Sequence, residues 1–238
     1  MRPETNMTAA STEKRISCII PAYNEGARIG HVLETVIGHP LLDEVIVVND
    51  GSTDNTRTVI ERFKGVRLVS FEKNRGKCRA VAEGLKQARN GTVMFIDSDL
   101  IGLTREDIGN LIGPVQSGAA DMTISLRGNA PWLWRLIGLD FISGERVFDR
   151  QLLMPHLDQL VTLPGFGLET FTNQLAMKNH LGIRVVKWPG VISPFPQAKF
   201  GVVRGTRRLL GMIAQIVKVG GFFGVIRMIF KMLSMRVK

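Results

Sequence analysis

Short apolar runs alternate with segments of helical spacing along the first hundred residues. The runs are Ile16–Pro21, Glu44–Val48, Val66–Phe71 and 93–96, and the helical segments are 27–38, one that begins after Ser52 or Thr53 as its cap, and 77–89. Runs that are apolar throughout are typical of strands buried on both faces of a sheet. Strands that alternate with helices of this length predict an α/β fold with a mostly parallel sheet flanked by helices.

The pattern loosens in the second half of the chain. It predicts a helix over 104–117 with Thr104 as its N-cap, a strand over 120–126, a loop over Arg127–Trp134, an element over 143–148, a helix over 165–180 and a strand over 183–188. Because no linker or repeat interrupts this order, we expect one domain over 15–200.

Polar turns follow three of the predicted strands, at Tyr23–Glu25, Asn49–Ser52 and Asp97–Asp99. The carboxyl ends of parallel strands meet at one edge of a sheet, so we expect these turns to line a common crevice. Asp97 and Asp99 follow a buried strand, where two carboxylates are costly unless a cation lies between them. The pattern therefore predicts a divalent cation between these two carboxylates.

The charge of the chain is concentrated in its last third. The formal net charge is +10, yet no Asp or Glu follows Glu169, and the twelve Lys and Arg residues beyond it leave the preceding part slightly acidic. A basic segment of this kind favours phosphate-bearing partners such as anionic lipids, nucleic acids or phosphorylated substrates.

The tail, residues 201–238, combines this basic charge with apolar runs at 209–217 and 222–230, separated by Gly220 and Gly221. No run of about 20 uncharged apolar residues exists, so two helices lying in a membrane interface are favoured over one spanning helix. The alternative is a pair of helices packed on the domain or on another subunit. Nucleic acid is not expected, because the basic residues lie among aliphatic ones without interleaved aromatic platforms.

The two cysteines, Cys18 and Cys78, are sixty residues apart and form no metal-binding pattern. This spacing argues against a disulfide framework and is typical of a reducing compartment. Residues 1–14 are polar, lack the apolar core of a signal peptide and are expected to be disordered. Together with the tail, these features predict a location at the cytoplasmic face of a membrane.

Four motifs carry a resemblance to a known family. They are Ile19–Glu25, Val47–Asp54, Asn74–Lys77 and Phe95–Asp99, and their order and spacing resemble the signature of family 2 glycosyltransferases of the GT-A fold. The resemblance implies a nucleoside-diphosphate sugar as donor and inversion at the anomeric carbon. Asn49 departs from the family pattern, in which a second Asp is frequent.

The resemblance also implies roles for individual residues. Pro21, Tyr23 and Glu25 would border the base and ribose, Asp50 would contact the nucleoside, Lys77 would belong to the donor site, and Asp97 and Asp99 would hold Mg²⁺ or Mn²⁺ against the diphosphate. Hard carboxylate oxygens suit these ions, which neutralise charge on the departing diphosphate.

The second half resembles the dolichyl-phosphate mannose synthase-like subgroup through Asp140–Phe148 and Gly167–Glu169. This implies a polyprenyl phosphate acceptor, whose phosphate Arg127 and Arg146 would bind, while Lys199 would reach the donor diphosphate. The alternative for each arginine is a surface salt bridge. A phosphate acceptor attacks without a dedicated base, but it needs cations to position it.

Two other functions stay open at this point. With a hydroxyl acceptor, such as a glycolipid or a small metabolite, the reaction needs a general base, and Glu169 is the candidate. The second alternative is a non-catalytic, basic, membrane-binding protein on the same scaffold. A dinucleotide-binding dehydrogenase is disfavoured because no GxGxxG motif follows the first strand.

Overall fold

The computed structural model describes residues 15–164, 167–194 and 221–237, together with residues 211 and 214. Lys199 and the N-terminal segment 1–14 lie outside the described residues, as does most of the tail helix expected over 209–217.

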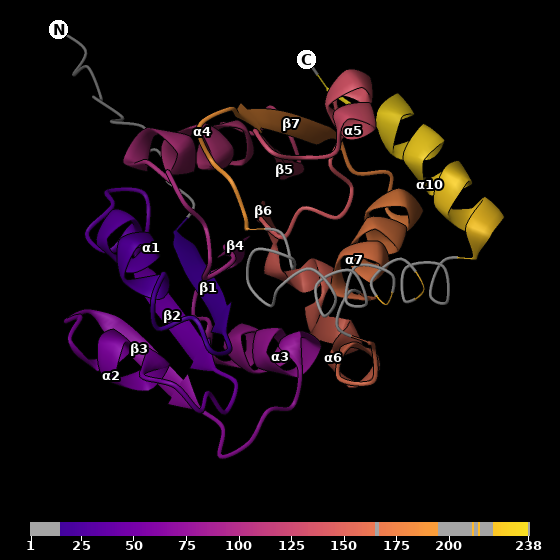
Figure 1. Cartoon of the computed structure of the whole chain (residues 1–238). Helices are drawn as coiled ribbons and strands as arrows, with labels where there is room; N and C mark the ends of the chain where they lie inside the picture. The colour runs from indigo at the N-terminus through magenta and orange to yellow at the C-terminus, as the bar shows by residue number, and fades with distance from the viewer. Residues whose placement is uncertain (1–14, 165–166, 195–210, 212–213, 215–220, 238) are drawn as a thin grey trace, which may run out of the picture.

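Seven strands form one sheet in the order β3-β2-β1-β4-β6-β5-β7 (Figure 1). The strands are β1 (Ile16–Ala22), β2 (Glu44–Asn49), β3 (Val66–Ser70), β4 (Thr92–Phe95), β5 (Met122–Arg127), β6 (Arg146–Asp149) and β7 (Ile183–Trp188). Strand β6 runs antiparallel to both β4 and β5, and the other pairs are parallel. The prediction of a mostly parallel α/β sheet is confirmed.

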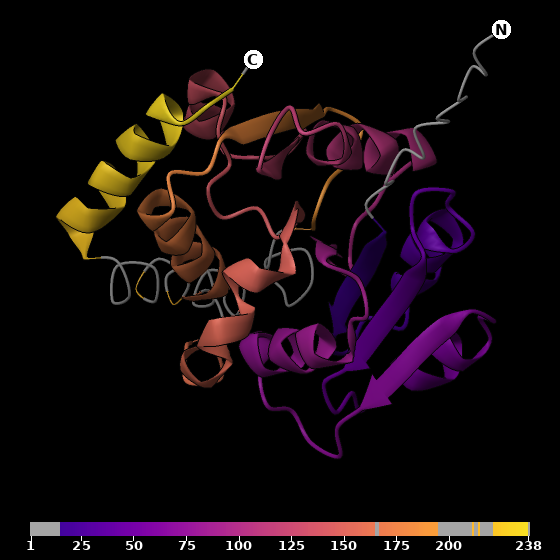
Figure 2. The ribbon, with the colours of Figure 1, turned by 180° about the vertical axis from the view of Figure 1, so that it is seen from behind.

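Helices cover both faces of the sheet (Figures 1 and 2). They are α1 (Ile29–Val36), α2 (Thr56–Glu61), α3 (Lys77–Gln87), α4 (Arg105–Gln116), α5 (Trp132–Ile137), α6 (Leu157–Leu160), α7 (Gly167–Lys178) and α10 (Phe222–Ser234), with 3₁₀ turns η1 (Arg150–Leu152) and η2 (Met154–His156). Successive strand residues point to opposite faces, so Ile19 packs in the core under α3 and α7, and Ile20 packs in the core under α1 and α4.

Two local predictions need correction. The loop expected over Arg127–Trp134 ends early, because helix α5 begins at Trp132. Neither Ser52 nor Thr53 caps α2: the Ser52 hydroxyl accepts a hydrogen bond from the Asn24 N–H, and Thr53 donates to the Asn24 side chain. Both residues therefore join two turns instead of starting a helix. Thr104, by contrast, caps α4 as predicted and forms a capping box with Asp107.

Helix α10 packs against α7 through one apolar face. Met228 and Met232 on that face are buried in the core that also contains Leu175 of α7. The sequence left two arrangements open for this part of the tail, a membrane interface or packing on protein. The inner face of α10 packs on the domain. Among the described helices, none combines the length and the apolar character that crossing a membrane requires.

Candidate active site

Three polar turns meet at one edge of the sheet, as predicted, because β2, β1 and β4 are parallel neighbours. The turns after β1 and β2 are tied together by Asn24, whose N–H donates to Ser52 Oγ (3.0 Å) and whose Oδ1 accepts from the Thr53 N–H (2.8 Å). Asn24 adopts a left-handed conformation, with φ of 55°. Such backbone is disfavoured for residues other than glycine, so these hydrogen bonds hold the turn in a fixed shape.

Asp50 fixes the segment that carries Lys77. Its carboxylate accepts hydrogen bonds from the backbone N–H groups of Arg75 (2.7 Å) and Gly76 (2.8 Å), so protein groups engage both oxygens. Burial raises the pKa of Asp50, and the two N–H groups oppose that rise. The next residue, Gly51, has φ of 66°, and a Cβ there would lie 2.3 Å from the carbonyl carbon of Lys73. Only glycine allows the two segments to approach this closely.

The residues expected to border the base and ribose lie on the rim of this edge. Tyr23 is 42% exposed, and Pro21 is half-buried. The Glu25 carboxylate lies 3.3 Å from the Arg28 guanidinium, and its backbone N–H donates to Thr56 Oγ1. An exposed aromatic ring beside the carboxyl ends of the strands is suited to stack on a base, so the predicted role remains compatible with the positions.

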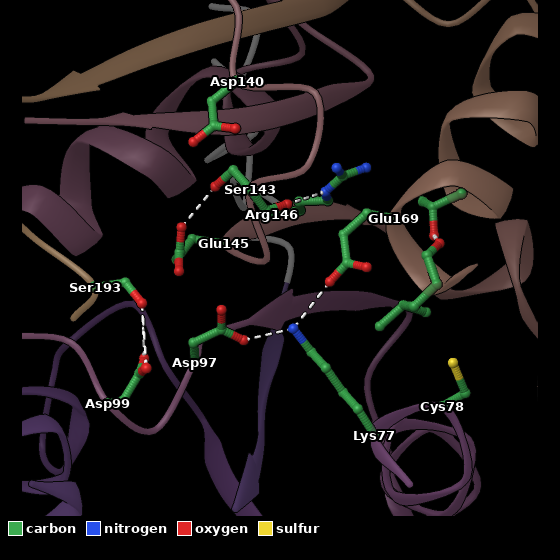
Figure 3. A network of polar contacts seen from close by, with 12 residues as sticks. Lys77, Cys78, Asp97, Asp99, Asp140, Ser143, Glu145, Arg146, Glu169 and Ser193 are labelled. Carbon is green, nitrogen blue, oxygen red and sulfur yellow. Dashed lines mark hydrogen bonds and ion pairs between the residues drawn. The ribbon is translucent and has the colours of Figure 1, made fainter. Parts of the chain in front are cut away.

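The two carboxylates of the Asp97–Asp99 motif have different neighbours (Figure 3). Asp97 Oδ1 accepts from Lys77 Nζ at 2.8 Å, whereas both oxygens of Asp99 lie within reach of Ser193 Oγ, at 3.1 and 3.3 Å. A two-way backbone contact between Ile101 and Ile192 holds Ser193 beside the motif. The chain after β7 therefore returns to complete the site at the end of β4.

Lys77 links the motif to Glu169, which comes from a different part of the fold. Lys77 Nζ donates to Glu169 Oε1 at 2.9 Å as well as to Asp97 (Figure 3). Burial alone would lower the pKa of Lys77, but the two carboxylates outweigh it and raise that pKa. Glu169 lies in the first turn of α7 and is 3% exposed, and its Oε2 has no hydrogen-bond partner among the described residues.

Arg146 does not reach the surface in this structure. It is 1% exposed, and its guanidinium donates to Ser143 O, Phe141 O and the Asn173 side chain at 2.5–2.8 Å. Since protein groups engage all of these donors, the geometry does not favour the expected contact with an acceptor phosphate. Burial also lowers the pKa of Arg146. The residue instead braces the loop before β6 against α7.

Arg127 forms salt bridges, as its alternative role required, but they are buried and not at the surface. Its guanidinium lies 3.2 Å from Asp140 and 3.7 Å from Glu145, and only 14% of the side chain is exposed. Burial raises the pKa values of both carboxyls, and Arg127 opposes that rise. Arg127 therefore neutralises buried acids in this structure, in place of the predicted acceptor contact.

The loop of residues 140–146 supports the site, a role that the sequence did not predict. Gly144 packs directly on the motif, because a Cβ at this position would lie 2.6 Å from Asp97 Oδ2. Glu145 is fully buried and accepts hydrogen bonds from Ser125 and Ser143 at 2.6–2.7 Å. Residues Ser143–Gly144–Glu145 lie within the motif Asp140–Phe148, from which the sequence predicted a role for Arg146 alone. The motif could therefore have indicated these three residues as well. Ser193, in contrast, has no recognisable motif around it.

The charges of the site suit a divalent cation. The contacts described above around the Asp97–Asp99 motif involve three cations and five carboxylates, a formal excess of two negative charges; the residues are Lys77, Arg127, Arg146, Asp97, Asp99, Asp140, Glu145 and Glu169. No group of three or more Asp, Glu, His or Cys residues in the described part of the chain is arranged to hold an ion by itself. Mg²⁺ and Mn²⁺ are commonly bound by one or two carboxylates together with substrate phosphates, which fits Asp97 and Asp99.

Comparison with known families matches residues 17–165, more than half of the chain, to "Glycosyl transferase family 2". The chain belongs to glycosyl transferase family 2. The matched region contains the strand-end turns, Lys77 and the Asp97–Asp99 motif, so the resemblance inferred from these motifs is confirmed at the level of the family. The relatives below are named as transferases or synthases, which favours an enzyme over the alternative of a non-catalytic scaffold.

Two of the relatives that match this chain are named for different substrates or products, and a third is uncharacterized. The chain is 38% identical to an uncharacterized glycosyltransferase, YaiP, of Escherichia coli over 166 residues. This aligned region makes up 67% of this chain and 37% of that protein. It is 39% identical over 90 residues (36% of this chain, 22% of the relative) to poly-beta-1,6-N-acetyl-D-glucosamine synthase of Staphylococcus epidermidis. It is 35% identical over 108 residues (43% and 28%) to 4,4'-diaponeurosporenoate glycosyltransferase of Staphylococcus aureus. The chain thus spans well under half the length of these relatives.

Solved structures of glucosyl-3-phosphoglycerate synthase from Mycobacterium tuberculosis share the fold. One, with Mn²⁺, UDP-glucose and phosphoglyceric acid, has a TM-score of 0.67 and 26% identity, and covers 92% of this chain and 85% of that one. Another, with Mg²⁺ and UDP, has a TM-score of 0.67 and 27% identity, and covers 89% and 81%. The fold of this family 2 glycosyltransferase is therefore the GT-A fold, and a divalent metal is its expected cofactor.

Proposed function

We propose that this protein transfers a sugar from a nucleoside diphosphate to the phosphate of a polyprenyl lipid, with inversion at the anomeric carbon. The observation that carries the choice of acceptor is the charge distribution: no Asp or Glu follows Glu169, while twelve Lys and Arg residues do. An anionic acceptor is attracted to such a region, and electrostatic attraction raises its local concentration.

The donor half of the reaction rests on the Asp97–Asp99 motif. A bound Mg²⁺ or Mn²⁺ would stabilise the charge that develops on the departing nucleoside diphosphate. Asp97 and Asp99 would supply oxygen ligands for it, and the cationic Lys77 Nζ lies 2.8 Å from Asp97, where it adds positive charge beside the diphosphate. The rim residues Pro21, Tyr23 and Glu25 would hold the nucleoside at the adjoining strand ends.

The acceptor half needs no base if the acceptor is a phosphate. A phosphate oxygen is anionic at neutral pH, so it attacks the anomeric carbon once it is positioned. Arg127 and Arg146 are engaged by protein groups, so we assign to them the support of the site and not direct phosphate contact. Lys199, which lies outside the described residues, remains a candidate for contact with the donor diphosphate.

A hydroxyl acceptor is the second candidate, and Glu169 favours it. Its Oε2 is buried and has no hydrogen-bond partner in the described part of the chain, as a base awaiting a proton would be. Two similar proteins show that acceptors vary: one is named for 4,4'-diaponeurosporenoate, and the solved synthase binds phosphoglyceric acid.

Glu169→Gln separates the two acceptors. We expect less than about a tenfold loss of kcat with a short-chain polyprenyl phosphate, because that reaction does not transfer a proton to Glu169. Glu83→Gln, on the outer side of α3, is the control and should leave transfer unchanged. Radiolabelled product would be measured for a panel of sugar nucleotides with Mn²⁺. A loss of about 10²-fold or more in Glu169→Gln, with glycolipids or other alcohols as the better acceptors, would exclude the lipid phosphate.

A further inference from the structure

Helix α10 is apolar on two sides, and among the described residues the domain covers one of them. The inner side packs on α7 through Met228 and Met232, whereas Ile226 (40% exposed) and Phe230 (69%) lie on the outer side. A surface helix of a soluble domain presents polar residues outward. The exposed apolar residues on the outer side of α10 therefore indicate contact with a partner outside the hydrophobic core.

Helix α5 presents a second set of exposed apolar residues. Trp132 is 70% exposed, Leu133 47% and Leu136 74%. Trp134, one residue away from Leu133, turns inward and forms an edge-to-face contact with Phe141 at 5.0 Å. The two tryptophans of α5 therefore differ: Trp134 packs, and Trp132 is exposed.

The two helices lie side by side at one end of the molecule (Figures 1 and 2). The guanidinium of Arg236, just beyond α10, donates to the Ile137 carbonyl at the end of α5 and packs on Gly138. We call the exposed apolar residues of these helices the α5–α10 surface: Trp132, Leu133, Leu136, Ile226 and Phe230.

The charged residues of both helices have a single sign. Arg135 on α5 and Arg227 and Lys231 on α10 are exposed, and neither helix contains an acidic residue. On α10 the cations alternate with the outward apolar residues, so Ile226 is followed by Arg227 and Phe230 by Lys231. Long basic side chains beside exposed aliphatic and aromatic ones are typical of helices that lie in the headgroup region of an anionic bilayer. Tryptophan is enriched at the same depth.

We infer that the α5–α10 surface docks on anionic lipid bilayers, with α10 lying in the plane of the interface. The apolar side chains enter the boundary of the acyl chains, while Arg135, Arg227 and Lys231 contact lipid phosphates. This inference shares Arg227 and Lys231 with the charge argument for the acceptor, but it uses none of the residues of the active site.

Sedimentation of the full chain with vesicles tests the inference. The probes are vesicles of phosphatidylcholine alone and vesicles in which phosphatidylglycerol replaces about a quarter of it. We expect binding to the anionic vesicles that weakens as salt is raised. Trp132→Ser/Phe230→Ser should lose binding to the anionic vesicles at least about tenfold, because burial of these side chains provides the apolar part of the affinity.

The charge variant Arg227→Gln/Lys231→Gln should lose the preference for anionic vesicles by roughly tenfold or more. Arg62→Gln/Lys64→Gln is the matched control, since it removes two exposed cations that follow α2, away from the α5–α10 surface. This variant should bind as the wild type does. Circular dichroism melts would verify that each variant is folded. Equal binding by the control and the charge variant would contradict the assignment of these cations.

Two other outcomes would overturn the inference. The first is a wild-type chain that does not sediment with anionic vesicles. The second is a concentration-dependent dimer in analytical ultracentrifugation that Trp132→Ser/Phe230→Ser abolishes, because a second copy of the chain would then be the partner. Sugar transfer to a short-chain acceptor in detergent would be measured in parallel. Its persistence in the variants would distinguish a failure to dock from a failure of the proposed reaction.

Discussion

Lys77 holds together two carboxylates that come from opposite sides of the site. Its ammonium lies 2.8 Å from Asp97, at the end of β4, and 2.9 Å from Glu169, at the start of α7. Without a cation between them, the two acids would repel each other in a poorly hydrated environment. The ion pairs therefore set the spacing between the donor side and the candidate base.

Replacement of this lysine tests that role. Lys77→Met should lower the free energy of unfolding by about 2 kcal/mol, because it leaves Glu169 buried without a cation, while partial exposure of Lys77 and Asp97 limits the loss. Urea unfolding at neutral pH would measure it. Lys86→Met, on the exposed side of the same helix, is the control and should change stability by less than about 0.5 kcal/mol. Adding Glu169→Gln to Lys77→Met should restore part of the loss, and a purely additive pair would contradict the coupling.

Gly144→Ala tests the packing of residues 140–146 on the metal motif. The added Cβ would lie 2.6–2.8 Å from the Asp97 carboxylate, so we expect that carboxylate to shift and Mn²⁺ affinity, measured by calorimetry with UDP present, to fall about tenfold. Gly109→Ala in α4 meets nothing within 4 Å and serves as the control. Unchanged Mn²⁺ affinity in Gly144→Ala would show that the contact is not needed.

The sequence identified the residue types of the site better than their surroundings. Asp97 and Asp99 follow from a buried strand that ends in acids, and Lys77 and Asp50 follow from the family motifs. A motif transfers the identity of a residue but not its exposure, so the burial of Arg146 could not be read from it. Ser193 is brought to Asp99 by a contact between distant segments, which no local pattern predicts.

At the scale of elements, the turns after β1 and β2 form one hydrogen-bonded unit. Thr56 donates its hydroxyl to Asp54 and accepts from the Glu25 N–H, and the Asp54 carboxylate also accepts from the backbone N–H groups of Thr56 and Gly26. Burial alone would raise the pKa of Asp54, but these hydrogen bonds outweigh it and lower that pKa.

This unit should make stability depend on pH in the acid range. Since the pKa of Asp54 is lower in the folded chain than in the unfolded one, its contribution is present above the unfolded value, about 4, and is lost as the pH falls through the folded value. We expect Asp54→Asn to be less stable than the wild type at about pH 6 and the difference to shrink by about pH 3. Unfolding in urea at several pH values measures this, and a constant difference would contradict the role of the charge.

Element types were predictable where the apolar pattern was strong. The parallel strands β1, β2, β3 and β4 match apolar runs, and α4 begins at the predicted cap. The antiparallel direction of β6 could not be predicted, because a strand of four residues carries no sign of its orientation. Helix α5 was missed because glycine, asparagine and proline just before it indicated a loop.

At the scale of the molecule, the parallel half of the sheet provides the donor side and the second half provides the opposite wall. Strands β1, β2 and β4 place the polar turns at one edge, and α7 with the loop before β6 brings Glu169 and the buried acids to meet them. Among the charged residues named for the site, each half contributes a formal excess of one negative charge to the place where the halves meet. We therefore predict that Asp97 and Asp99 hold a divalent metal on which binding of the donor depends.

Titration of the purified chain with UDP and other nucleoside diphosphates, with and without Mn²⁺, would test this prediction. We predict that the wild type binds its nucleotide tightly only with the metal, and that Asp97→Asn and Asp99→Asn each lose metal-dependent binding together with about 10²-fold or more in sugar transfer. Asp158→Asn, at an exposed position on α6, should behave as the wild type does. Unchanged metal-dependent binding and transfer in the double variant Asp97→Asn/Asp99→Asn would show that these two carboxylates do not hold the metal.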